Sequence, residues 1–326
     1  MLGKKLVTAD PKLVLGFGGA RRGVGRSHTL IDTANTLSRA KCKAKREGLE
    51  VPTVCDRDSA VVHRSVVTES YFQSSPEGFT PRAHAHGPWA EDMMHGRLLG
   101  GLAARALGLE FGGEGWRAAR LTVDLFRPAA MAPVQITTQV VRDGRKVRVA
   151  DATATCDGHE VARVTGLFLS EGEEPPGDIW QPERSSWPDP ETIASPDDPD
   201  STGDVYGWLF RTVEGGMGTG ERSRVWTNDT NPLLDDEPMS PLVRAAVSGD
   251  IACPLANAST DGVHYINADY TMFIARYPVG DWIGVEVAQQ IDSTGISIAS
   301  ATMVDQNGPF ATSSGSSISR PPLRSE

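Results

Sequence analysis

The sequence predicts an α+β protein built from two copies of one unit, a helix followed by an antiparallel sheet. In both halves of the chain, a stretch with helical spacing of apolar residues precedes four runs rich in alternating apolar and polar residues. Turn signals such as Asp143-Gly144 and Asp157-Gly158 separate the runs of the first half, which favours hairpins between sequence neighbours. The pattern therefore indicates two antiparallel meanders, each accompanied by one buried helix.

The two halves also match residue by residue, which indicates an internal duplication. Identical residues recur at a nearly constant separation of 149 or 150 positions, in strands and in turns alike. The pairs are Arg127 with Arg276, Ala150 with Ala299, Ala152 with Ala301 and Gly158 with Gly308.

In the first unit, a short strand at Tyr71-Phe72 and a turn near Phe79 come before the helix, which we expect from His95 to Leu107. Gly100 and Gly101 in this helix would each cost about 1 kcal/mol relative to Ala, so we expect the helix to pack closely on the sheet there. The predicted strands are Leu121–Phe126, Val134–Val141, Lys146–Cys156 and Glu160–Leu169.

In the second unit, Ser240 and Pro241 predict the start of a helix, with proline at the first helical position. The predicted strands are Tyr265–Ile274, Trp282–Ile291, Gly295–Val304 and Pro309–Ile318.

The composition divides the chain into four parts. Residues 1–65 hold 13 basic and 6 acidic side chains and no clear period, so we expect a flexible basic N-terminal extension. Residues 66–170 and 205–320 are the two repeats. Residues 171–204 form a linker with seven prolines and 11 acidic residues against one basic residue, which Trp180 and Trp187 would hold to the folded part.

The totals exclude several classes of protein. The formal net charge is −10, which disfavours a nucleic-acid binder because phosphate contacts need clustered Lys and Arg. No apolar run reaches the roughly 18 residues that span a membrane. The cysteines form no Cys-x-x-Cys pair, so we expect reduced thiols in a cytoplasmic protein and no zinc site. They are Cys42, Cys55, Cys156 and Cys253.

Other catalytic or binding motifs fail on their residues. The glycines Gly18 and Gly23 have phosphate-loop spacing, but Val24 and Gly25 follow where Lys and Ser or Thr are needed. No Gly-x-Ser-x-Gly occurs, so a serine-hydrolase elbow is not indicated. Histidines cluster near residue 90, but no carboxylate completes a metal-ligand spacing.

A family resemblance arises from motifs in both repeats. The motifs are His95-Gly96, Leu121-Thr-Val-Asp-Leu-Phe-Arg-Pro128, Ile266-Asn-Ala-Asp-Tyr-Thr271, Gly280-Asp-Trp282 and Asp305-Gln-Asn-Gly-Pro309. Over roughly residues 68–320 the chain resembles the acyl-CoA thioesterase II-like proteins of the thioesterase superfamily, in their actinobacterial form. This resemblance implies a double hot-dog fold.

The resemblance also implies the reaction, which is hydrolysis of acyl-CoA to a fatty acid and free CoA without a metal or redox cofactor. In the family pattern an Asp, a Ser or Thr hydroxyl and a Gln orient the attacking water. Asp269 matches the Asp, and Thr294 or Ser293 matches the hydroxyl, whereas Gly315 stands at the Gln position.

The chemistry of the reaction adds one expectation. A thioester carbonyl becomes an oxyanion during attack, and the amides at a helix start can hold it. His95 and Gly96 stand at such a start, so we predict substrate and oxyanion binding there.

Two readings stay open from the sequence. The first is a thioester hydrolase of fatty acid metabolism that acts on acyl-CoA. The second is a non-catalytic acyl-CoA-binding protein, in which Gly315 marks the lost Gln. The oligomeric state is open between a monomer and a homodimer.

Overall fold

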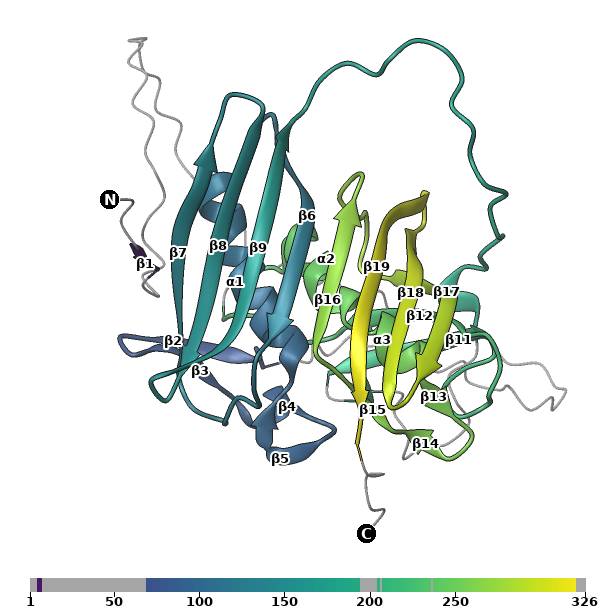
Figure 1. Ribbon diagram of the computed structural model, residues 1–326, viewed down its shortest axis with the longest axis horizontal. Helices are drawn as coiled ribbons and strands as arrows, with labels where there is room; N and C mark the ends of the chain where they lie inside the picture. The colour runs from purple at the N-terminus through teal and green to yellow at the C-terminus, as the bar shows by residue number, and fades with distance from the viewer. Residues whose placement is uncertain (1–4, 8–68, 194–203, 206, 236, 321–326) are drawn as a thin grey trace, which may run out of the picture. The chain divides into compact units, whose positions relative to one another are not determined.

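The structure describes most of both predicted repeats and part of the linker between them. This computed structural model describes residues 5–7, 69–193, 204–205, 207–235 and 237–320 of the chain. Each repeat combines a central helical segment with antiparallel strands, so the predicted α+β architecture of two tandem units is confirmed (Figure 1).

The first repeat contains one long helix and a meander of long strands. Its elements are β2 (Phe72–Ser75), β3 (Gly78–Pro81), the 3₁₀ turn Ala83–Ala85, β4 (His86–Gly87), β5 (Ala90–Met94), α1 (Gly96–Phe111), β6 (Trp116–Leu125), β7 (Val134–Asp143), β8 (Val147–Cys156) and β9 (His159–Ser170).

The second repeat has the same order of elements with a divided helix. After the 3₁₀ turn Pro190–Thr192 of the linker come β10 (Asp204–Val205), β11 (Trp208–Glu214), β12 (Arg224–Asp229), α2 (Pro241–Gly249), α3 (Ala252–Ala256), β13 (Ala258–Ser259), β14 (Gly262–Val263), β15 (Tyr265–Asn267), β16 (Asp269–Ile274), β17 (Ile283–Ser293), β18 (Ile296–Asp305) and β19 (Gly308–Ser319). The predicted helix starts are thereby confirmed, and the four strands of each meander are present. The strand predicted from Leu121 begins earlier, at Trp116, and the strand predicted at Tyr265–Ile274 is divided into β15 and β16.

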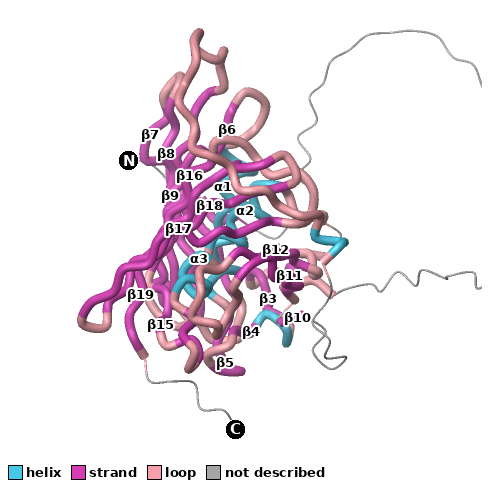
Figure 2. Tube along the Cα trace, turned by 90° about the vertical axis from the view of Figure 1, so that its right-hand side faces the viewer, coloured by secondary structure: helices cyan, strands magenta, loops and turns pink. Residues whose placement is uncertain are grey.

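Most of these strands join one antiparallel sheet that both repeats share. Its order is β10-β11-β12-β17-β18-β19-β16-β6-β9-β8-β7-β3-β2, with β15 beside β19 and β1 (Lys5–Val7) beside β7. The helices lie on one side of this sheet (Figure 2). Strands β11 and β12, which were not predicted from the sequence, correspond to β2 and β3, respectively, at the opposite edge.

The two repeats meet at the pairing of β6 with β16. Thr122 and Thr271 are cross-strand partners, and their hydroxyl oxygens lie 3.2 Å apart. These two residues are separated by the repeat offset of 149, so the pairing is centred on equivalent positions. A register of this kind is what a two-fold relation between the repeats requires.

The duplication has one offset throughout the long strands. β8 and β18 begin 149 residues apart, as do β9 and β19, and both hairpins carry a bulge at the same place. The equivalent of Gly158 is therefore Asn307 rather than Gly308, which corrects the pairing at 150 positions that the sequence suggested.

Two glycines set the distance between the helices and the sheet. A Cβ on Gly100 of α1 would lie 2.2 Å from the Tyr270 hydroxyl oxygen, and a Cβ on Gly249 of α2 would lie 2.3 Å from Met272 Sδ. Gly100 and Gly249 are equivalent by the offset of 149. The close packing that the sequence predicted around Gly100 is therefore confirmed in both repeats.

The helix of the second repeat is broken by a proline. Pro254 has no N–H to donate to the carbonyl of Asp250, four residues earlier, and its ring would clash with that carbonyl. α2 ends at Gly249 and α3 begins at Ala252, so Asp250 lies in the break. The free Asp250 carbonyl accepts a hydrogen bond from Asn267 Nδ2 at 3.0 Å.

Outside the repeats, the structure tests the predictions only in part. β1 pairs with residues 136–138 of β7, whereas residues 1–4 and 8–65 of the predicted extension lie outside the described residues. In the linker, Trp187 packs on Trp226 with ring centroids 4.8 Å apart, and Trp226 Nε1 donates to the Pro188 carbonyl. Trp180 is 84% exposed, so Trp187 alone of the two attaches the linker.

We expect Gly100→Ala to lower the free energy of unfolding by about 1–3 kcal/mol, although Ala favours a helix by about 1 kcal/mol. The added Cβ would displace the Tyr270 hydroxyl, which donates to the Ala246 carbonyl at 2.9 Å. Gly108→Ala is the matched control in the same helix, because its Cβ would meet only the end of the Leu242 side chain. Urea denaturation measures both; equal stability of the two variants would contradict the packing argument.

Candidate active site

The start of α1 offers backbone amides without a side-chain acceptor. His95 precedes the helix in an extended conformation (φ −69°, ψ 123°) and makes no side-chain cap hydrogen bond. Its backbone N–H donates to the Ala85 carbonyl, which fixes the entry of the chain into the helix. A Cβ on Gly96 would lie 2.9 Å from Leu125 Cδ1, so the helix start packs closely on the end of β6. No side chain therefore occupies the backbone N–H groups at the start of α1, and oxyanion binding there stays a prediction.

A buried ion pair fixes the first turn of α1. Arg97 Nη1 lies 2.5 Å from Asp229 Oδ1, and both side chains are almost fully buried. Tyr71 and Trp208 also donate hydrogen bonds to the Asp229 carboxylate, and the Arg97 guanidinium stacks 3.7 Å from the Trp208 ring centroid. These contacts join β11 and β12 of the second repeat, and Tyr71 just before β2, to the helix start.

Asp250 lies beside His95, although the two residues belong to different repeats. The Asp250 Oδ2 atom is 4.0 Å from His95 Nδ1, and the side chains are only 7% and 12% exposed, respectively. Asn267 Nδ2 donates to Asp250 Oδ1 at 2.8 Å. Burial raises the pKa of the Asp250 carboxyl, while the bond from Asn267 and the charge of Arg97 oppose the shift.

Burial acts in the opposite direction on His95. It lowers the pKa of the imidazole well below its usual value, and the positive charge of Arg97 adds to this effect. His95 is therefore neutral at neutral pH. Its ring also meets Trp208 edge to face, with centroids 5.5 Å apart.

Asp269 is the first residue of β16 and lies at an irregularity between β16 and β19. Its Oδ1 accepts a hydrogen bond from the Ser316 N–H at 2.9 Å and a second bond from the Ser316 hydroxyl. Its strand partner across the repeat seam is Asp124, whose pKa is raised first by burial and then by the charge of Asp269. The hydroxyl that the structure brings to Asp269 is thus that of Ser316.

The other two predicted catalytic residues lie elsewhere. Ser293 ends β17 and Thr294 occupies the following two-residue turn with φ 50°. Two strands, β18 and β19, separate β17 from β16 in the sheet order. The structure therefore does not bring Ser293 or Thr294 together with Asp269, because a hairpin turn places both at the end of their hairpin.

Gly315, at the position of the family Gln, lies against Asp269. A Cβ there would be 2.4 Å from the Asp269 carbonyl oxygen and 2.7 Å from Cys253 Sγ. Any side chain at this position would displace α3 or β16. The packing around Gly315 therefore leaves no room for a side chain at this position.

Asp250 and its neighbours were not predicted from the sequence. Asp250 follows the predicted helix without any motif, and Asn267 lies inside a motif that indicates only the family resemblance. Pro254 was the available signal, since a proline inside a helical pattern predicts a break four residues earlier.

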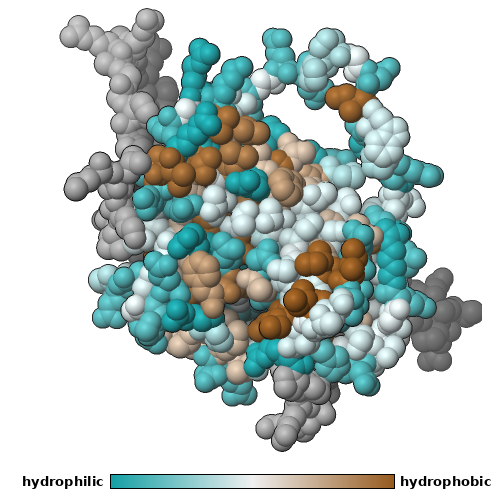
Figure 3. Space-filling model, viewed as in Figure 1, coloured by the Kyte–Doolittle hydropathy of each residue, from teal (hydrophilic) through white to brown (hydrophobic). Residues whose placement is uncertain are grey.

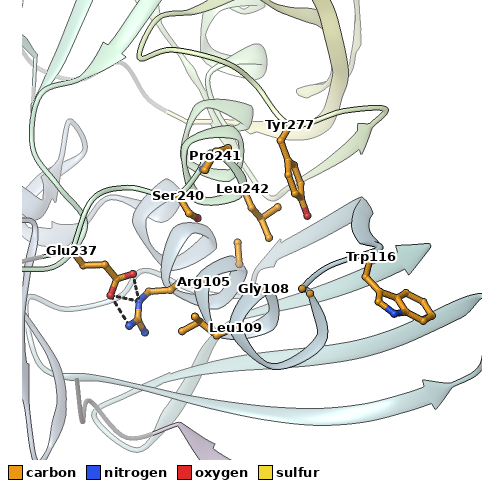
Figure 4. Close-up of a pocket in the computed structure, with 12 residues that line it drawn as sticks. Arg105, Gly108, Leu109, Trp116, Glu237, Ser240, Pro241, Leu242 and Tyr277 are labelled. Carbon is orange, nitrogen blue, oxygen red and sulfur yellow. Dashed lines mark hydrogen bonds and ion pairs between the residues drawn. The ribbon is translucent and has the colours of Figure 1, made fainter. Parts of the chain in front are cut away.

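Two pockets lie away from the start of α1. A pocket of about 230 Å³ lies between the last turns of α1 and the start of α2. Glu237 binds Arg105 at one side of it, and Trp116 and Tyr277 lie at the other (Figure 4). A second pocket, of about 510 Å³, lies between the linker at Trp187 and the chain near Trp282. Arg105, in the first pocket, is more than two helical turns from Gly96, and neither pocket is lined by His95, Gly96 or Asp250.

The sheet face turned away from the helices carries an exposed apolar patch on β17–β19 (Figure 3). Cross-strand pairing brings its members together. They are Ile291, Ile296, Ile298 and Ile318, each about half exposed. We call these four residues the isoleucine patch. Within the described part of the chain, no helix is both long and apolar enough to cross a membrane.

Comparison with protein families gives two adjoining matches. Residues 85–169 match the N-terminal domain of acyl-CoA thioesterases, and residues 182–317 match the C-terminal domain of acyl-CoA thioesterases. Together the two matches cover most of the chain and correspond to its two repeats. The search of curated proteins gave no match.

Solved structures show the same fold at low sequence identity. A TesB protein of Mycobacterium avium subsp. paratuberculosis has a TM-score of 0.58 and 18% identity over 74% of this chain and 93% of its own. A thioesterase II-type protein of Thermobifida fusca has a TM-score of 0.59 and 15% identity over 78% of this chain and 96% of its own. A hot-dog protein of unknown function from Alicyclobacillus acidocaldarius has a TM-score of 0.57 and 16% identity over 74% of this chain and 92% of its own. The double hot-dog fold is thereby confirmed.

We expect Arg97→Ala to lower the free energy of unfolding by about 3–5 kcal/mol, because it leaves the buried Asp229 carboxylate without its cation. Arg163→Ala is the control at an exposed ion pair with Glu160 and should cost less than about 1 kcal/mol. Chemical denaturation followed by tryptophan fluorescence measures both. Similar losses in the two variants would show that the buried pair does not stabilise the fold.

Proposed function

The chain belongs to the acyl-CoA thioesterase family, and from this premise we propose that acyl-CoA is hydrolysed at the start of α1, beside His95 and Gly96. The reaction of the family is hydrolysis of an acyl-CoA thioester to a free carboxylic acid and CoA. Both family domains are present, one in each repeat, which favours an active hydrolase over a binding protein that has lost the reaction.

The observation that supports this location is the uncapped helix start. No side chain caps α1, and Gly96 has no side chain of its own to cover its amide. An oxyanion formed from the thioester carbonyl would accept hydrogen bonds from these amides and benefit from the positive end of the helix dipole. Donors of this kind stabilise a transition state because they are fixed before the reaction begins.

The identity of the residues that activate water stays a prediction. Asp269 has a hydroxyl partner in Ser316, next to Gly315 at the family Gln position. Ser293 and Thr294 remain candidates from the resemblance alone, and a role at Asp269 would require the β17–β18 hairpin to rearrange.

The proposal extends to the metabolic role, the cellular compartment and the oligomeric state. We place the enzyme in fatty acid metabolism and in the cytoplasm, with acyl-CoA as its partner. The support is that Cys156 and Cys253 are free thiols, as is usual in a reducing compartment. A homodimer is supported by the isoleucine patch, because pairing two such faces would remove it from water.

Incubation of the full chain with a panel of acyl-CoAs tests the reaction. We expect free CoA to appear in step with the carboxylic acid, detected by a thiol reagent and by mass spectrometry. Saturable binding of acyl-CoA without thiol release above background would contradict the hydrolase and support the binding protein.

Gly96→Pro tests the location, because it removes the backbone N–H while keeping a helical backbone. Proline is favoured at the first helical position, and the extended His95 suits the residue before a proline. We expect kcat to fall about 10²–10³-fold. Gly96→Ala adds the same Cβ near Leu125 but keeps the N–H, and should retain most activity. Equal activity of the two variants would exclude this amide as an oxyanion donor.

A further inference from the structure

The duplication creates two equivalent places where the helical segment of one repeat faces that of the other. One place joins His95 and Gly96 to Asp250. By the offset of 149, the other place would join Arg244 and Ala245 to Gly101. There the helix begins four residues earlier, at Pro241, so Ala245 lies inside α2 and its amide is not at a helix end. A helix start beside a carboxylate thus exists at one of the two places.

The carboxylate at this place has an unused oxygen. Asn267 occupies Oδ1 of Asp250, whereas Oδ2 accepts no hydrogen bond from any described residue. Neither ring nitrogen of His95 makes a hydrogen bond within the described residues, although the side chain is only 12% exposed. A separation of 4.0 Å between Asp250 Oδ2 and His95 Nδ1 lets one water hydrogen-bond to both.

The charges around Asp250 come from several elements. Arg97 on α1 is the cation that acts on it, and Arg97 itself is paired with Asp229 on β12. Cys253 on α3 and Tyr270 on β16 feel the negative charge of Asp250, and burial holds both protonated, with the pKa of Cys253 raised to about 12. Among these three acidic groups, the one available to take a proton is therefore the Asp250 carboxylate.

Resting on the proposed function, we propose that Asp250 is the catalytic base of this site and that His95 positions the attacking water. Asp250 Oδ2 takes a proton as the water oxygen bonds to the thioester carbonyl carbon. The carbonyl electrons move to the oxygen held by the Gly96 amide. When the oxyanion collapses, the C–S bond breaks, and the sulfur of CoA receives the proton from Asp250. The products are a carboxylic acid and CoA, and Asp250 is regenerated.

The contacts of Asp269 distinguish it from Asp250. The backbone N–H and the hydroxyl of Ser316 both donate hydrogen bonds to the Asp269 carboxylate. The carboxylate therefore takes the place of a backbone carbonyl as the acceptor between β16 and β19. In this arrangement Asp269 holds β19 in place next to Asn267, which in turn orients Asp250.

Asp250→Asn tests the proposal in the full chain, with thiol release from an acyl-CoA that the wild type hydrolyses. The amide keeps an oxygen for Asn267 to donate to. We expect kcat to fall at least about 10²-fold with KM nearly unchanged. Asp292→Asn, an exposed change on β17, is the matched control and should leave kcat unchanged. A folded Asp250→Asn variant with wild-type kcat overturns the proposal. The proposal also fails if Asp269→Asn loses activity while Asp250→Asn keeps it.

A second measurement covers an Asp250→Asn variant that does not fold. The pH dependence of kcat in the wild type and in His95→Gln should show a loss of activity at acidic pH with a pKa above the ordinary value of about 4. If the loss of kcat at acidic pH disappears in His95→Gln, the titrating group is the imidazole, and this result overturns the proposal. A wild type that releases no thiol overturns the proposed function itself, which separates that failure from a wrong choice of base.

Discussion

The pairing of β6 with β16 is the interaction on which the rest of the structure depends. It joins two half-sheets into one, and its register, centred on Thr122 and Thr271, sets the two-fold relation between the repeats. The helical segments of both repeats then lie on the same face, and the start of α1 faces the end of α2. A site shared by two repeats follows from this register, because neither repeat contains both the helix start and the carboxylate.

Close packing on that face limits what the sequence can vary. Gly100 and Gly249 lie where any side chain would strike the joint sheet, so both repeats kept glycine at this position. Pro254, in contrast, changed only the second repeat. By ending α2 at Gly249 it freed the carbonyl of Asp250 and left the carboxylate in the break instead of on a regular helix. The repeats thus share a scaffold and differ where the chemistry lies.

The polar groups at the start of α1 are stable in the interior because they are paired. Arg97 and Asp229 neutralise each other, and Tyr71 and Trp208 donate hydrogen bonds to the same carboxylate. The low dielectric around this cluster strengthens these bonds and also shifts Asp250 and His95 in opposite directions, since burial disfavours the charged form of each. These contacts offset the desolvation of the buried ion pair, and the pair in turn fixes the geometry of the helix start.

The sequence alone determined the duplication, the order of helix and strands, the family resemblance and the helix start at His95-Gly96, because these depend on local periodicity and on motifs of neighbouring residues. It placed Ser293 and Thr294 with Asp269 by family pattern, and it overlooked Asp250. Only the tertiary structure decided which side chains meet, because cross-strand register and the helix break bring together residues more than 150 positions apart. His95 and Asp250 carry no shared motif, and their proximity exists only once both repeats share one sheet.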